Sequence, residues 1–274
     1  MPKLWTMDDI PWGRFDATKL DPDIVKVAKA AAMVESNAVD YASYLSNVFP
    51  DDETFRKAAW DWADEEVQHG EALGRWAEMA DPGFDYAESF RRFREGFKIP
   101  LDATSSVRGS RTGELIARCM VEVGTSSYYT ALGEATEEPV LREICKRIAT
   151  DEWRHYGLFY KHMKRYLDEE HLNKLQRLRV ALSRIAESED DELAYAYYAA
   201  NADGAPYDRR TYNREYAQRA YALYRPKHVE RAVSMVFKAV GFDPHGVASK
   251  TMTRGVSWVM GRRAKRLAAQ GQAA

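Results

Sequence analysis

The sequence predicts an all-α protein: a four-helix bundle of two helical hairpins joined by a long crossover, followed by a C-terminal helical extension. Apolar residues recur with a helical period through most of the 274-residue chain, and no stretch shows the alternation typical of a half-buried strand. Turns that contain proline divide the first part of the chain into helices with short, long and short connections. We therefore assign the bundle to residues 1–168 and the extension to residues 169–274.

The first hairpin is expected to contain helices over residues 21–48 and 53–80. Asp21 followed by Pro22 is typical of an N-cap with proline at the first helical position. Pro50 lies in the short turn between the two helices, and Asp81-Pro82-Gly83 follows the second helix.

The second hairpin is expected to contain helices over residues 111–135 and 139–167. A crossover of about thirty residues precedes it and should hold a short helix near 86–97. Five further helices are expected in the extension, over residues 170–187, 189–201, 209–224, 226–240 and 247–269.

Composition excludes several classes of protein. Hydrophobic residues make up 45% of the chain and the net charge is −2, which gives no overall attraction to nucleic acid. We see no apolar run of about 18 residues and no secretory signal, so we expect a cytoplasmic protein. Cys119 and Cys145 lie in helical patterns, where buried free thiols are favoured over a disulfide.

Two Glu-x-x-His motifs suggest a metal centre. Glu66 with His69, and Glu152 with His155, are each three residues apart, which places both side chains on one face of a helix. Either pair alone would be expected by chance in a chain so rich in glutamate. Both pairs, however, lie on stripes that are otherwise apolar, which favours ligands in a helix-bundle core.

Each partner helix supplies one more glutamate on its inner stripe. These are Glu35 and Glu122, which are 87 residues apart, while Glu66 and Glu152 are 86 residues apart. This equal spacing predicts that the two hairpins form equivalent halves of one dinuclear site. Two divalent ions would neutralise four buried carboxylates, and this oxygen and nitrogen donor set suits iron, with manganese as an alternative at one or both positions.

Residues next to these ligands are candidates for supporting roles. An acid precedes each motif glutamate, and we expect Asp151 to orient His69 and Glu65 to orient His155; the alternative is that both are surface carboxylates. A second set consists of small residues that would line an apolar oxygen pocket or simply pack the helices together. These are Ala38, Val39, Thr125 and Ser126.

At these residues the chain resembles the ferritin-like di-iron carboxylate proteins, which include rubrerythrins, bacterioferritins and soluble acyl-carrier-protein desaturases. The resemblance covers about residues 21–167. Segments 65–73 and 151–155 are most similar to the desaturase signatures. Thr125, three residues after Glu122, matches a desaturase threonine beside the oxygen pocket.

The resemblance implies two iron ions bridged by Glu66 and Glu152, with Thr125 as a catalytic residue. One iron would be held by Glu35, Glu66 and His69, and the other by Glu122, Glu152 and His155. The resemblance also implies that the protein is a di-iron oxidoreductase that activates O2. Such an enzyme would be a desaturase or hydroxylase that acts on an apolar acyl or lipid-like substrate. An electron donor such as a ferredoxin is then an expected partner.

Two alternatives remain open at this point. The first is a rubrerythrin- or bacterioferritin-like peroxidase or ferroxidase, and the second is a di-iron tRNA hydroxylase. After position 224 the sequence contains ten lysine and arginine residues but only two acidic residues, and residues 254–266 are especially basic. That segment is either a docking site for an acyl carrier protein or an anionic membrane surface, or a solvated helix end. A homodimer is compatible with the sequence.

Overall fold

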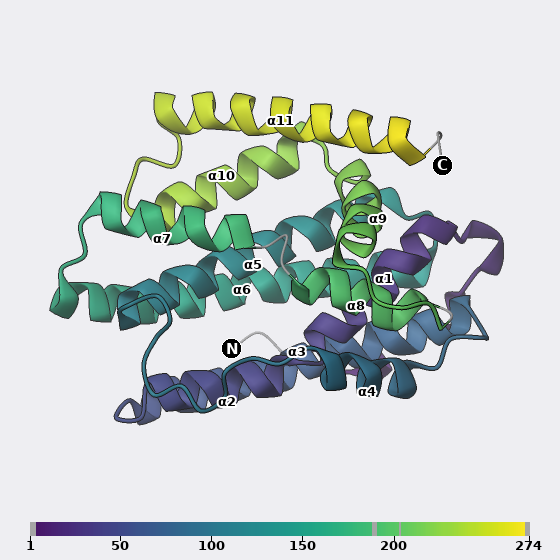
Figure 1. Ribbon diagram of the computed structural model, residues 1–274, viewed down its shortest axis with the longest axis horizontal. Coiled ribbons are helices and arrows are strands. Elements are labelled where there is room, and N and C mark those ends of the chain that lie inside the picture. The colour runs from purple at the N-terminus through teal and green to yellow at the C-terminus, as the bar shows by residue number, and fades with distance from the viewer. Residues whose placement is uncertain (1–3, 188–190, 203, 272–274) are drawn as a thin grey trace. The chain divides into compact units, whose positions relative to one another are not determined.

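The computed structural model describes residues 4–187, 191–202 and 204–271, and all regular elements within these ranges are helical (Figure 1). The expected all-α class is confirmed. Three short 3₁₀ helices lead into the α-helices; they are Met7–Asp9, Trp12–Arg14 and Ala17–Lys19. The α-helices are α1 (Pro22–Glu35), α2 (Ala38–Val48), α3 (Glu53–Ala80), α4 (Tyr86–Gly96), α5 (Arg111–Ala135), α6 (Pro139–Glu170), α7 (Lys174–Glu187), α8 (Asp191–Asn201), α9 (Arg209–Ala222), α10 (Pro226–Val240) and α11 (Val247–Gly271).

Most helix boundaries agree with the sequence prediction, and α3 and α5 match it at both ends. The expected start of α7 at residue 170 is wrong, because α6 continues to Glu170 and His171 then adopts a left-handed φ of 55°. Asn173 next accepts hydrogen bonds from the backbone N–H groups of Leu175 and Gln176, which caps α7. The expected start of α8 at Glu189 lies outside the described residues.

The prediction of one continuous helix over residues 21–48 is also wrong. The chain forms α1 and α2 with an interruption at Ser36 and Asn37, where the Asn37 N–H donates to Val34 O instead of to the carbonyl four residues back. This interruption changes the direction in which later side chains point. Val39 is 43% exposed, so it does not line a buried pocket as expected.

The chain forms two compact units, which are described separately. Unit 1 consists of Met1–Ser105, Leu132–Ile148 and Glu189–Tyr216; unit 2 consists of Ser106–Ala131, Ala149–Ser188 and Ala217–Ala274. Helices α5 and α6 each contribute residues to both units. The predicted domain boundary at residue 168 stays a prediction.

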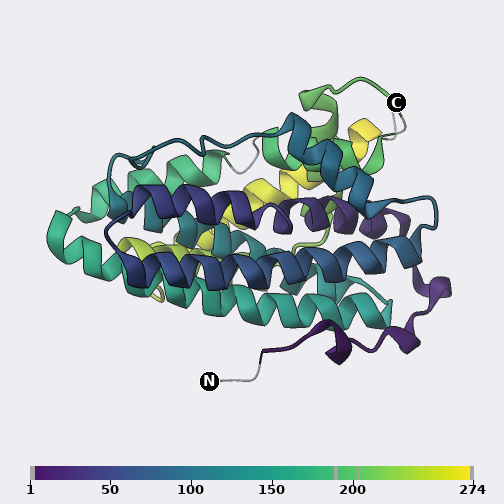
Figure 2. The same cartoon turned by 90° about the horizontal axis from the view of Figure 1, so that it is seen from below.

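In unit 1, α1 and α2 run end to end along α3 (Figure 2). Helix α8 packs on α1 and α4. The apolar stripe expected on α3 is confirmed, since its members are all buried. They are Ala59, Trp62, Leu73 and Trp76, with Glu66 and His69 between them.

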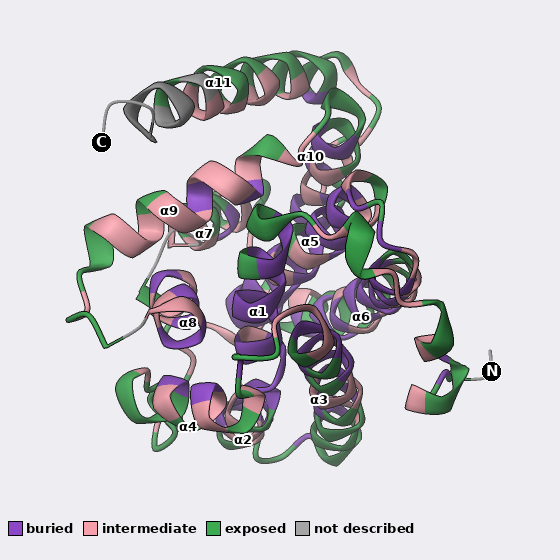
Figure 3. Cartoon of the chain, turned by 90° about the vertical axis from the view of Figure 1, so that its right-hand side faces the viewer, coloured by how far each residue is buried: buried purple, intermediate pink, exposed green. Residues whose placement is uncertain are grey.

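In unit 2, α10 packs against α7 and α11. A small core of Val229, Val233 and Phe237 on α10 meets Val256 and Met260 of α11. Figure 3 contrasts α1, which is buried along most of its length, with α11, which is mostly half-buried or exposed. Across the described residues, no helix combines the length and the apolar character needed to cross a membrane.

Candidate metal centre

Unit 1 contains a buried triad of two carboxylates and one imidazole. Glu35 is the last residue of α1, and Glu66 and His69 come from adjacent turns of α3. The Nδ1 atom of His69 lies 3.2 Å from Oε2 of Glu66 and 3.8 Å from Oε2 of Glu35. All three side chains are buried.

The end of α1 is held against α3 by a close contact beside this triad. The Ser36 hydroxyl donates to Ala32 O (2.7 Å) and also hydrogen-bonds with the Tyr86 hydroxyl. A Cβ atom on Gly70 would lie only 2.1 Å from Ser36 Oγ and 2.9 Å from Ser36 N. Glycine is therefore required after His69 so that α1 can approach α3 closely enough to bring Glu35 to the triad.

One ring face of His69 is covered by Trp5, which sequence analysis did not identify. The two rings are stacked, with 5.8 Å between centroids and 5° between planes. Gln68 donates to the Trp5 carbonyl at 3.1 Å, and the Arg147 guanidinium lies over the Trp5 ring. These contacts fix the aromatic cover that shields the imidazole.

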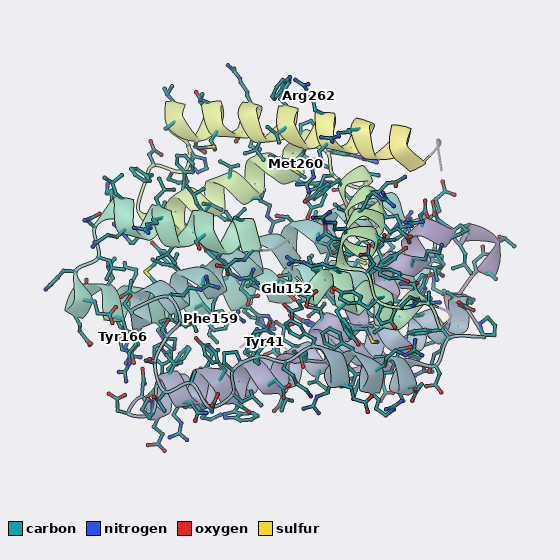
Figure 4. The ribbon with its side chains drawn as sticks, in the orientation of Figure 1. Tyr41, Glu152, Phe159, Tyr166, Met260 and Arg262 are labelled. Atoms are coloured by element: carbon teal, nitrogen blue, oxygen red, sulfur yellow. The ribbon has the colours of Figure 1, made fainter. Side chains whose placement is uncertain are left out.

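Unit 2 contains a second triad with the same composition. Glu122 comes from α5, and Glu152 and His155 come from α6, on which Figure 4 labels Glu152. The Nδ1 atom of His155 lies 3.9 Å from Oε2 of Glu122 and 3.9 Å from Oε2 of Glu152. These three side chains are almost completely buried.

Thr125 contacts the second triad directly. Its hydroxyl donates to Oε2 of Glu152 at 2.7 Å, a shorter contact than those to the carbonyls of Val121 (3.2 Å) and Glu122 (3.4 Å). A hydroxyl has only one proton to donate, and we assign that proton to the shortest contact, which is the one with the Glu152 carboxylate. Thr125 therefore holds one oxygen of Glu152 in a fixed orientation.

The two acids expected to orient the histidines have different surroundings. Asp151 is buried and accepts a 2.7 Å hydrogen bond from Arg154, one turn along α6. Glu65 is half-buried on α3. Their expected bonds to His69 and His155 stay predictions.

The donor atoms of each triad suit one metal ion. Ligand atoms about 2.1 Å from an ion lie about 3.0 Å apart at a right angle and about 4.2 Å apart when opposite. In each triad the ligand atoms lie within 4.8 Å of one another, and the imidazole–carboxylate separations of 3.2–3.9 Å fall inside that interval. Three protein ligands leave coordination positions open for water or a reactant.

Thiolate ligation plays no part in this arrangement. Cys119 and Cys145 are both free and buried, as the sequence predicted. Burial raises the pKa of both thiols, and the nearby Glu122 carboxylate raises that of Cys119 further. Both therefore remain neutral and apolar in character at physiological pH.

No protein-family model matches the chain, and no curated protein matches it.

Proposed function

We propose that this protein is a di-iron oxidoreductase that uses O2 to attack an apolar acyl or lipid-like substrate. The observation that carries the proposal is the presence of the same buried Glu, Glu, His donor set in each unit. The equal spacing along the chain and the resemblance to ferritin-like proteins favour one dinuclear centre made from both triads. In that centre Glu35, Glu66 and His69 would hold one ion, and Glu122, Glu152 and His155 would hold the other.

Charge supports the presence of cations. Each triad places two carboxylates where water is excluded, and burying a carboxylate without a compensating charge costs several kcal/mol. A divalent ion in each triad would balance its two negative charges. Carboxylate and imidazole donors suit iron or manganese and would not select the softer metals that thiolates bind.

The surrounding residues would fix the ligands before any reactant arrives. Iron, when bound, supplies the electrons and the Lewis acidity that O2 activation requires. The Thr125 hydroxyl orients Glu152, and the contact between Ser36 and Gly70 positions Glu35. Trp5 keeps water away from one face of His69, which protects that ligand from exchange.

The proposal is tested first by metal content. Anaerobic Fe(II) titration should give two irons per chain, and Glu122→Ala should remove most of that iron. Glu71→Ala is the matched control, because Glu71 is an exposed carboxylate on α3 five residues beyond Glu66. Retention of two irons per chain in Glu122→Ala would contradict the site.

A second measurement tests whether the triads form one centre. Protein loaded with two Mn(II) ions should show an exchange-coupled EPR spectrum if the ions share carboxylates. Two independent six-line signals would refute a dinuclear centre while leaving two separate metal sites in place.

A third measurement separates oxygenase from protective activity. The reduced, iron-loaded protein is exposed to O2 with and without a fatty-acyl carrier, and substrate oxidation and peroxide are both quantified. Electron consumption coupled to substrate oxidation supports the proposal. Rapid peroxide turnover without substrate, or growth of a mineral core, would instead identify a peroxidase or ferroxidase.

A further inference from the structure

Helix α11 has one side that is already covered within unit 2. Val256 and Met260 pack against the apolar core of α10. Figure 4 places Met260 on the side of α11 that faces α10, and Arg262 on the opposite side. The outward side of α11 is therefore separate from the contact that holds the helix in place.

The outward side combines large apolar side chains with positive charge. Trp258 is 62% exposed, and the Arg262 guanidinium lies 4.7 Å from the centre of its ring. Val247, three helical turns before Trp258, is exposed on the same side, whereas the exposed side chains of Met252 and Val259 lie at helical spacing from Val256 and Met260 and so border the α10-facing side. Among the side chains of α11 that the structure describes, the exposed cations are Lys250, Arg254, Arg262 and Arg266, and the sequence of α11 contains no acid.

We propose that the outward side of α11 binds the surface of a lipid bilayer rich in anionic headgroups. Helices that lie in a membrane interface place cations at the headgroups and insert apolar side chains just beneath them. Tryptophan is favoured at that depth because its ring is apolar and its N–H is polar. Arginine stacked on Trp258 presents the cation and the ring to the interface together.

Other occupants fit these residues less well. A second copy of the chain that docked through the same side of its own α11 would bring cations against cations. A nucleic acid would bind the cations but would leave Val247 exposed to water. A bilayer satisfies the charged and the apolar side chains at the same time. The inference does not depend on the metal centre.

The expected strength follows from the number of cations. Each Lys or Arg near an anionic membrane surface contributes about a fivefold gain in partitioning, from roughly 1 kcal/mol. Replacing Lys250, Arg254 and Arg262 by Gln should therefore weaken binding about a hundredfold. Replacing Val247 and Trp258 by Ser should weaken it about tenfold, because partial insertion buries only part of each side chain.

The test uses the full chain and sedimenting vesicles of two compositions. One contains phosphatidylcholine alone and the other contains about a third phosphatidylglycerol. Binding should require the anionic lipid and should fall as salt rises from 0.1 to 1 M, because the screening length shortens from about 10 to 3 Å. Brominated lipid should quench a fluorescence component that is missing in Trp258→Phe.

A matched control separates local from total charge. Lys161, Lys164 and Arg179 are exposed cations on α6 and α7 in the same unit, and changing them to Gln removes the same charge. We expect this triple variant to bind like the unaltered protein. The substituted positions are exposed, so circular dichroism should show unchanged helix content in both triple variants.

Two results would overturn the proposal. The first is equal loss of binding in the control and α11 triple variants, which would indicate a general charge effect. The second is failure of the unaltered protein to bind anionic vesicles, including the case in which it binds an acidic carrier protein or RNA instead.

Discussion

Gly70→Ala tests whether the close approach of α1 to α3 beside the candidate metal centre is as tight as the structure indicates. The new Cβ would lie 2.1 Å from Ser36 Oγ, 2.9 Å from Ser36 N and 3.1 Å from Ala32 O. Two of these atoms belong to the backbone, so a side-chain rotation cannot relieve the overlap. Overpacking costs about 1–3 kcal/mol, with more in rigid sites, while alanine regains about 1 kcal/mol of helix propensity.

Because two of the overlaps are with backbone atoms, we place the cost at the upper end of that range, which gives a net loss of about 2 kcal/mol in the free energy of unfolding. For a chain of this size that corresponds to a fall of roughly 4–8 °C in Tm. Gly157→Ala is the matched control, because Gly157 is also helical and its Cβ would meet nothing within 4 Å. That change should raise stability by up to about 1 kcal/mol.

Thermal and urea unfolding followed by circular dichroism at 222 nm give the stability of both variants. Adding Ser36→Ala to Gly70→Ala should restore only part of the loss, because the overlaps with backbone atoms remain. The reasoning is refuted if Gly70→Ala is as stable as the unaltered protein while Gly157→Ala is more stable.

Three further outcomes are expected. Thr125→Val should lower thermal stability and change the spectrum of the iron-loaded protein, whereas Thr125→Ser should preserve both, because serine keeps the donor to Glu152. Trp5→Ala should accelerate removal of metal by a chelator, and Trp5→Phe should largely retain the slow rate. The Lys29 ammonium holds the pKa of Asp81 below its ordinary value of 3.8. Their contact therefore stabilises the fold above pH 3.8. This stabilisation is lost as the pH falls through the lower pKa of the folded state. Asp81→Asn should therefore lower Tm at pH 7, and the difference should shrink as the pH falls below 3.8; an unchanged difference would exclude this linkage.

The helices and the stripes that carry the Glu-x-x-His motifs could be predicted because their signals are local. The stripe of α3 repeats at helical spacing, and proline marks where helices begin and end. A glutamate and a histidine three residues apart on such a stripe share a face whatever packs against them. Burial of Glu66 and His69 therefore followed from spacing alone.

The interruption after Glu35 could not be predicted, because its cause is tertiary. Serine and asparagine have only modestly lower helix propensity than their neighbours. What favours the interruption is the contact of Ser36 with Tyr86 and with the bare backbone at Gly70, which are both distant in sequence. Trp5 was missed for a similar reason, since it precedes the first 3₁₀ helix in a segment with no periodic pattern.

The same interruption gives Glu35 an unusual electrostatic position. It places a buried carboxylate at the last residue of α1, where the helix dipole presents its negative end. A negative charge is disfavoured there, and a cation in the triad would remove that penalty. Glu35→Gln should therefore raise the Tm of the metal-free protein while reducing the further rise that metal produces.

This pair of opposite effects distinguishes a metal ligand from a residue of the packed core. Metal that binds only the folded state stabilises it by about 2.7 kcal/mol per site at a hundredfold excess over Kd. Thermal unfolding with and without Mn(II) measures both the Tm of the metal-free protein and the rise in Tm that the metal causes. Glu71→Gln is the control, because Glu71 is exposed on α3. A purely structural Glu35 would predict the reverse for the metal-free protein: Glu35→Gln would lower its Tm, and the rise caused by Mn(II) would be unchanged.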